Sequence, residues 1–106
     1  MEAIRPTTFI ESEKLKTALG IDLTIASETF QHTGSFKFRA AYNLALNVAN
    51  DEILTASSGN FGQALAFACQ IANKKCTVVM PETSARVKIE AVKSYGATID
   101  LVDTKV

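Results

Sequence analysis

The feature that most constrains the fold is a regular alternation of short apolar segments with longer helical ones in the second half of the chain. Apolar runs at Ile53 to Ser57, Cys76 to Met80 and Thr98 to Val102 have the length and composition of buried strands. The segments between them carry apolar residues at helical spacing. This order predicts an α/β fold with a parallel βαβαβ sheet and right-handed crossovers. Because wholly apolar strands are typical of parallel sheets buried on both sides, we expect helices over both faces.

The two connecting helices have recognisable limits. The second runs from Ser84 to Tyr95, after Pro81, and Gly96 ends it. The first follows Gly59, and we expect one face of it to be buried through Phe61, Ala64, Leu65, Ala68, Cys69 and Ala72.

The first half of the chain reads as helix, strand, loop and helix, over residues 12–19, 23–28, 29–35 and 36–49. For the last of these helices we expect Ser35 as the N-cap and a buried face at positions 36, 40, 44 and 48. The Asn50-Asp51 turn is the predicted seam between two regions, 1–50 and 51–106. Only the second would be an α/β unit.

Composition excludes several classes of function. The 106 residues include eleven basic and eleven acidic side chains without a charge run, so no extended surface for nucleic acid is expected. No apolar run approaches the roughly 20 residues of a membrane span, and the N-terminus lacks signal-peptide features, which predicts a cytoplasmic protein without a membrane contact. With two cysteines and one histidine, no metal site is expected, and Cys69 and Cys76 should be buried thiols.

The loop Ser57-Ser58-Gly59-Asn60 lies at the carboxyl end of a predicted strand and opens a helix. The first N–H groups of a helix have no intrahelical partner, so such a loop can hold a carboxylate or phosphate. Gly59 would let the backbone approach the ligand closely. The alternative is structural: Ser58 or Asn60 caps the helix and Gly59 makes the turn.

Lys37 follows Thr33-Gly34-Ser35-Phe36 and falls in the first turn of a predicted helix. The positive end of the helix dipole and the nearby Arg39 both disfavour an ammonium there and would favour the neutral, nucleophilic amine. An ordinary solvated lysine is the alternative. Phe36 beside it is predicted to be a core residue or, alternatively, a platform for a ring.

Two sequence blocks, ETFQHTGSFKFRAA and SSGNFGQALAFA, resemble signatures of the fold-type II pyridoxal-phosphate enzymes, in the serine/threonine dehydratase and serine racemase branch. The stretch VVMPETSARVKIEAVKSYGATI is similar to later elements of that family. The resemblance implies that residues 1–50 belong to the large domain of such an enzyme, and that residues 51–106 are an incomplete small α/β domain.

The resemblance also implies roles for individual residues. Lys37 would form the Schiff base with pyridoxal 5′-phosphate and later move protons at the substrate's α-carbon. Ser58 would face the same carbon from the opposite side, an arrangement that permits racemisation as well as elimination. Phe36 would pack on the cofactor ring, and Asn60 would hydrogen-bond its 3′-oxygen. The substrate carboxylate would be held by Ser57, Ser58, Gly59, Asn60 and Phe61, the last replacing a histidine that is common in the family.

The family's glycine-rich phosphate-binding loop would lie beyond Val106, so we expect the N-terminal part of a longer dehydratase or racemase that is inactive alone. The substrate would be a small hydroxy amino acid. The competing hypothesis is a non-catalytic α/β module that binds an anion at Ser57 to Asn60 or self-associates. Self-association is expected because the edge of the last strand is exposed and the strand at Leu23 to Glu28 has no predicted partner. A homo-oligomer is compatible with either hypothesis.

Overall fold

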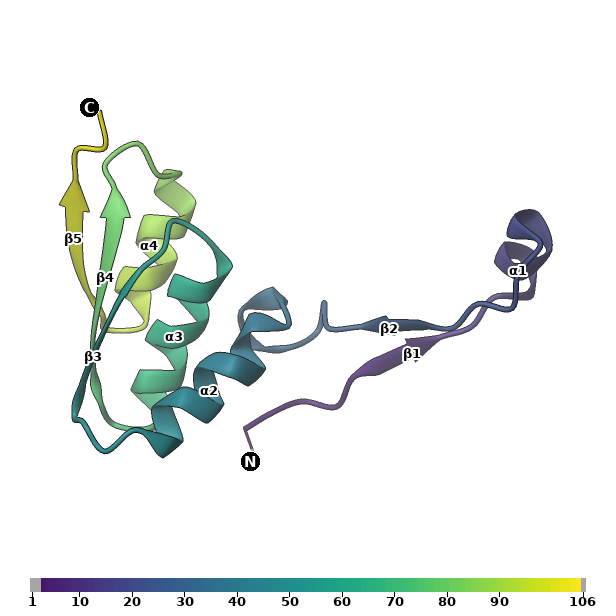
Figure 1. Ribbon diagram of the computed structural model, residues 1–106, viewed down its shortest axis with the longest axis horizontal. Coiled ribbons are helices and arrows are strands. Elements are labelled where there is room, and N and C mark those ends of the chain that lie inside the picture. Colours follow the sequence, from purple (N-terminus) through teal and green to yellow (C-terminus); the bar gives the residue numbers. More distant parts are fainter. Residues whose placement is uncertain (1–2, 106) are drawn as a thin grey trace.

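The computed structural model describes residues 3–105 as an α/β body with a long N-terminal arm (Figure 1). The arm contains β1 (Thr8–Ile10), α1 (Glu13–Leu19) and β2 (Ile25–Ser27). A short 3-10 turn, η1 (His32–Gly34), leads into the body. The body consists of α2 (Lys37–Asn47), β3 (Glu52–Ala56), α3 (Asn60–Ile71), β4 (Lys75–Pro81), α4 (Arg86–Ser94) and β5 (Thr98–Val102).

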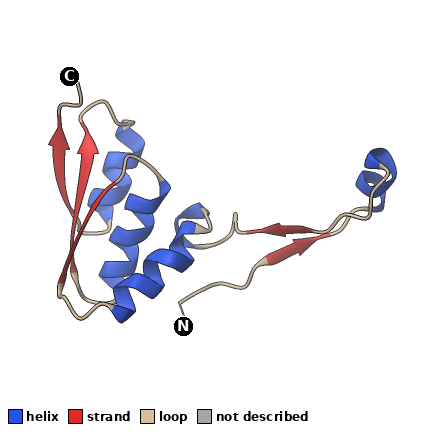
Figure 2. Ribbon diagram, viewed as in Figure 1, coloured by secondary structure: helices blue, strands red, loops and turns tan. Residues whose placement is uncertain are grey.

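The three strands of the body form a parallel sheet in the order β3-β4-β5, as the alternation of segments predicted. The expectation of helices on both faces is wrong for the described residues, because α3 and α4 lie on the same side of the sheet (Figure 2). When neighbouring strands follow each other in one direction, crossovers of one hand place every helix on one face. The opposite face remains open, and Leu54 on it is 68% exposed.

The core lies between the sheet and α2, with α3 in the middle (Figure 1). Helix α3 packs against α2 on one side and β4 on the other. A helix with neighbours on two sides must be apolar on two sides. It therefore buries Gly62 and Ala66 in addition to the predicted Ala64, Leu65, Ala68 and Cys69. Cys69 and Cys76 are buried free thiols, as predicted.

Helix α2 begins later and turns another face inward than the sequence predicted. Phe36 is the N-cap residue, and the side chain of Ser35 makes no capping bond. The buried residues are Phe38, Ala41, Tyr42 and Ala45, whereas Phe36 is 61% exposed. Both faces of this helix are apolar in sequence, and contact with α3 selects the second one. The N-cap at Ser35 and the buried face at 36, 40, 44 and 48 are thus corrected.

The arm is an antiparallel pair of strands with α1 at its tip. Thr8 pairs with Ser27 and Ile10 with Ile25, so the segment expected to be an unpaired strand has a partner. Strand β1, which is only three residues long, was not predicted from the sequence. Helix α1 is capped by Ser12 and ends at Gly20, whose φ of 68° suits glycine. None of the helices in residues 3–105 is both long and apolar enough to cross a membrane.

Candidate active site at the carboxyl edge of the sheet

The loop after β3 is built around the hydroxyl of Ser57. Its Oγ accepts hydrogen bonds from the N–H of Gly62 at 3.0 Å and from that of Gly59 at 3.3 Å. Ser57, rather than Ser58 or Asn60, therefore satisfies part of the start of α3. A serine side chain of this loop thus does cap the helix, but it is Ser57, for which only ligand binding was predicted.

This cap leaves other polar groups of the loop free. Within residues 3–105, the N–H groups of Ser58, Asn60 and Phe61 have no hydrogen-bond partner, and the same holds for the side chains of Ser58 and Asn60. Both of these side chains are exposed. Unpaired donors at the positive end of a helix attract an anion. Three of the five predicted carboxylate-binding residues, Ser58, Asn60 and Phe61, thus carry free donors, and Ser57 supports the loop through its bonds to Gly59 and Gly62.

The two glycines of this segment have different surroundings. A methyl group at Gly59 would meet only the Nζ atom of Lys88, at 3.8 Å. One at Gly62 would lie 3.1 Å from Cγ1 of Val78 and 3.3 Å from Ser57. Val78 is fully buried and has little room to move. The need for a small residue at position 62 depends on contact with β4, so it could not be predicted from the local sequence.

We expect Gly62→Ala to destabilise the chain by up to about 2 kcal/mol, since overpacking costs roughly 1–3 kcal/mol and alanine's higher helix propensity returns about 1 kcal/mol. Gly59→Ala is the matched control and should change stability little. Urea denaturation followed by circular dichroism measures both. Equal stability of the two variants would show that α3 and β4 separate easily.

Lys37 lies in the first turn of a helix, as the sequence predicted; it is the first residue of α2, and its side chain is half-buried. Its Nζ atom lies 4.9 Å from the centre of the Phe36 ring, a cation–π contact. The start of α2 is held against α3 by Phe38, whose ring is 5.6 Å from that of Phe67. Phe67 follows Asn60 by seven residues, which is roughly 10 Å along α3 at a rise of 1.5 Å per residue. The first turn of α2, which Lys37 begins, therefore contacts α3 roughly 10 Å from the free donors.

The backbone just before Lys37 is unusual. Thr33 has a φ of 61° and Gly34 one of 74°. A β-branched residue in the left-handed region is strained, and such strain gathers at functional sites. The hydroxyls of Thr33 and Ser35 are buried without a partner among the described residues. This turn, with its orphaned hydroxyls, separates Lys37 from the end of the arm.

Arg39, which was expected to act on Lys37, instead forms an ion pair. Its Nε donates to Oε2 of Glu28 at 2.7 Å, and its second guanidinium nitrogen donates to Thr7 at 2.9 Å. Gln31 completes the network by bonding the backbone of Arg5 on both its amide atoms. The charge of Arg39 is thus compensated by Glu28, and the network fixes the arm to the first turn of α2.

The ion pair predicts a pH dependence of stability. Hydrogen bonding from Arg39, then from Thr7 and Gln31, lowers the pKa of Glu28 from 4.5 to about 2. Because the pKa of Glu28 is lower in the folded state than in the unfolded chain, its ionised carboxylate stabilises the fold above pH 4.5. This stabilisation is lost as the pH falls toward 2 and the carboxylate takes up a proton. We expect the urea midpoint of wild type to exceed that of Glu28→Gln at pH 6, and the two to converge near pH 2. A difference independent of pH would contradict the pairing.

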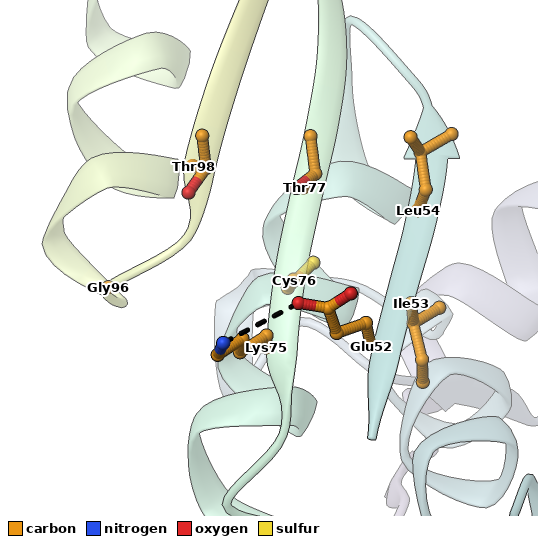
Figure 3. A pocket seen from close by; sticks show the side chains of 8 residues that line it. All are labelled: Glu52, Ile53, Leu54, Lys75, Cys76, Thr77, Gly96 and Thr98. Carbon is orange, nitrogen blue, oxygen red and sulfur yellow. Dashed lines mark ion pairs between the residues drawn. The ribbon is translucent and has the colours of Figure 1, made fainter. Parts of the chain in front are cut away.

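A hollow of about 260 Å³ lies elsewhere, on the open face of the sheet (Figure 3). It is lined by the first residues of the three strands, and Glu52 and Lys75 form an ion pair of 3.6 Å across it. These residues belong to the amino ends of the strands. Ligands of parallel sheets bind at the carboxyl ends, where Ser57 to Asn60 lie, so we place the site there.

The site combines a lysine at the start of one helix with free donors at the start of another, on a parallel α/β fold. Comparison with known proteins identifies the class of protein to which this arrangement belongs. The sequence matches the family described as "Pyridoxal-phosphate dependent enzyme" over residues 1–106. The chain therefore belongs to this family. Within it, the relatives place the chain in fold type II, in the serine racemase and threonine dehydratase branch.

Two relatives and one solved structure illustrate the similarity. The chain is 38% identical to the serine racemase of Dictyostelium discoideum over 100 residues, which are 91% of this chain and 31% of that protein. It is 39% identical to the chloroplastic biosynthetic threonine dehydratase 2 of Solanum lycopersicum over 94 residues, 85% of this chain and 16% of the relative. The processed threonine deaminase isoform 2 of Solanum lycopersicum matches with a TM-score of 0.89 at 33% identity. That match covers 98% of this chain and 30% of the other. The chain thus spans less than a third of the length of these relatives.

Proposed function

We propose that this chain carries the lysine and the carboxylate loop of a pyridoxal-phosphate-dependent serine/threonine ammonia-lyase or serine racemase. The observation that supports it most is that two helices packed against each other carry the two segments: Lys37 begins α2, and the free donors of Ser58, Asn60 and Phe61 are at the start of α3. Neither start is closed by a side chain at its N-cap. The substrate would be a small hydroxy amino acid.

The residues present fit the cofactor and a substrate in their chemistry. Lys37 offers a primary amine for an aldehyde, Phe36 an exposed aromatic ring, and Asn60 an unpaired side-chain amide. When bound, pyridoxal phosphate supplies an electron sink for a carbanion at the substrate's α-carbon. The N–H groups of Asn60 and Phe61 would hold the substrate carboxylate.

In this proposal two groups of the chain move protons. The Nζ atom of Lys37 takes the proton from the α-carbon on one side, and the hydroxyl of Ser58 faces the same carbon on the other. A group on each side allows a proton to be removed on one face and returned on the other, as racemisation requires. Elimination needs only the lysine side. Ser58 is exposed and unpaired in residues 3–105, so its hydroxyl is available for such contact.

The proposal is tested by finding which lysine the cofactor modifies. Pyridoxal phosphate added to the chain should produce the near-visible absorbance of a lysine-bound cofactor. Reduction with borohydride, digestion and mass spectrometry should then locate most of the label on Lys37. Labelling spread evenly over exposed lysines such as Lys93 and Lys105 would contradict the assignment.

We also propose that the protein acts in the cytoplasm and self-associates. Large apolar side chains are exposed on the arm, among them Phe9 at 70% and Ile10 at 44%, and Leu54 is exposed on the open face of the sheet. Uncovered apolar surface of this kind attracts a partner.

This surface also supports the second candidate function, a non-catalytic self-associating module. Light scattering at high concentration distinguishes a monomer from an oligomer, and a sharp dimer that takes up no cofactor would favour the second candidate.

A further inference from the structure

We infer that Lys88 is the cationic residue that recognises the charge of a carboxylate bound at the start of α3. The inference rests on the proposed function in one respect, namely that this loop binds a carboxylate. It adds a specificity-determining residue that comes from a different helix and that is not among the predicted site residues.

The topology places Lys88 at the loop. Strands β3 and β4 are paired in parallel, so the loops that follow them are neighbours at the carboxyl edge of the sheet. Helix α3 follows the first loop and α4 the second, and the two helices pack side by side (Figure 1). Lys88 is in the first turn of α4. Its Nζ atom is 3.8 Å from the point where a side chain on Gly59 would begin.

The electrostatics of this contact call for an anion. Lys88 is half-buried, and within residues 3–105 its amine makes neither an ion pair nor a hydrogen bond. Lys16, by comparison, pairs with Asp22 at 2.9 Å. An ammonium beside the positive end of α3 is repelled by the free N–H groups there. A carboxylate between them would accept hydrogen bonds from the amides and would neutralise the ammonium.

The division of roles makes the inference testable. Backbone N–H groups are neutral donors, which can bind a carboxylate or an uncharged amide oxygen. An ammonium adds a preference for the charged group. Lys88 should therefore determine how strongly the loop prefers a carboxylate to an amide of the same shape. Acetate and acetamide are such a pair of probes.

The experiment follows the backbone amide signals of Gly59, Asn60 and Phe61 by NMR while the ¹⁵N-labelled chain is titrated with each probe. Wild type should bind acetate more tightly than acetamide. In Lys88→Met the Kd for acetate should rise about tenfold, the size expected for a charge-assisted hydrogen bond, with little change for acetamide. Lys88→Arg should keep the preference. Lys93→Met is the matched control, since Lys93 is an exposed lysine in the last turn of the same helix.

Three results would overturn the inference. Wild type could show no acetate-dependent shift at these amides, or Lys88→Met could bind acetate as tightly as wild type does. Alternatively, Lys88→Met could lose acetate and acetamide binding equally, which would indicate a structural role for Lys88. If Lys88→Met does not fold, Lys88→Gln and the preference retained by Lys88→Arg decide the matter. Trapping of pyridoxal phosphate on Lys37 is measured separately in each variant. Acetate binding without Lys37 labelling would refute the proposed function and leave the role of Lys88 intact.

Discussion

Replacing Phe38 with alanine is expected to destabilise the chain by about 3–5 kcal/mol, the usual effect of deleting a buried aromatic side chain. Phe38 is fully buried and contacts three other rings: Tyr42 at 5.5 Å, Phe67 at 5.6 Å and His32 at 5.1 Å. Its loss opens a cavity between α2 and α3 and removes these aromatic contacts. Because domains of this size have a total stability of only some 5–15 kcal/mol, a large part of the fold's stability depends on this ring.

Phe36→Ala is the matched control for this prediction. It deletes the same ring two residues earlier, where the side chain is 61% exposed. We expect a change of less than about 1 kcal/mol, because little apolar surface leaves a buried position. Urea denaturation curves of the two variants and wild type measure the difference. Similar losses in both would mean that α2 also buries its other face in solution, as self-association through that face would cause.

Replacing Lys37 with alanine is expected to abolish nearly all site-specific incorporation of pyridoxal phosphate. The chain has eight lysines, and any exposed amine can react with an aldehyde at high concentration. Lys37 differs from the others because it begins a helix after a strained turn, beside an exposed aromatic ring, and because that helix packs against the one that carries the unpaired donors. In the variant, the near-visible band should disappear at cofactor concentrations that saturate wild type.

Lys93→Ala provides the control for non-specific reaction, and the band should be unchanged in it. The stability of Lys37→Ala should equal that of wild type, since the side chain has no ion pair among the described residues. A persistent band in Lys37→Ala, with the trapped label on another lysine, would contradict the assignment of Lys37 as the residue that holds the cofactor.

Much of the local structure was predictable because it depends on neighbours in sequence. The strand Thr98 to Val102 was predicted with its observed limits, and Ser12 and Gly20 bound α1 as expected. The position of Lys37 at a helix start and of the Ser57 loop at a strand end was predictable for the same reason. Their proposed chemistry came from resemblance to a family, because each feature alone has a structural explanation.

Contacts between distant elements were not predictable in the same way. Phe36 and Phe38 are two residues apart, which places them on opposite faces of a helix, and no local rule says which face meets α3. The pairing of β1 with β2 depends on three-residue strands whose propensity is too weak to detect. The need for glycine at position 62 arises from Val78, sixteen residues later.

The sequence alone thus determined the order of strands and helices from α1 onward, the parallel sheet, and the positions of two segments, Lys37 and Ser57 to Asn60, because periodicity, capping and turn preferences act over a few residues. Only the tertiary structure decided that both crossover helices share one face, that Phe38 rather than Phe36 is in the core, that Arg39 is engaged by Glu28, and that the amine of Lys88 stands at Gly59. The physical reason is that packing joins residues by shape and charge across space. Several apolar faces and several cations in this chain are equivalent until the neighbouring elements are in place.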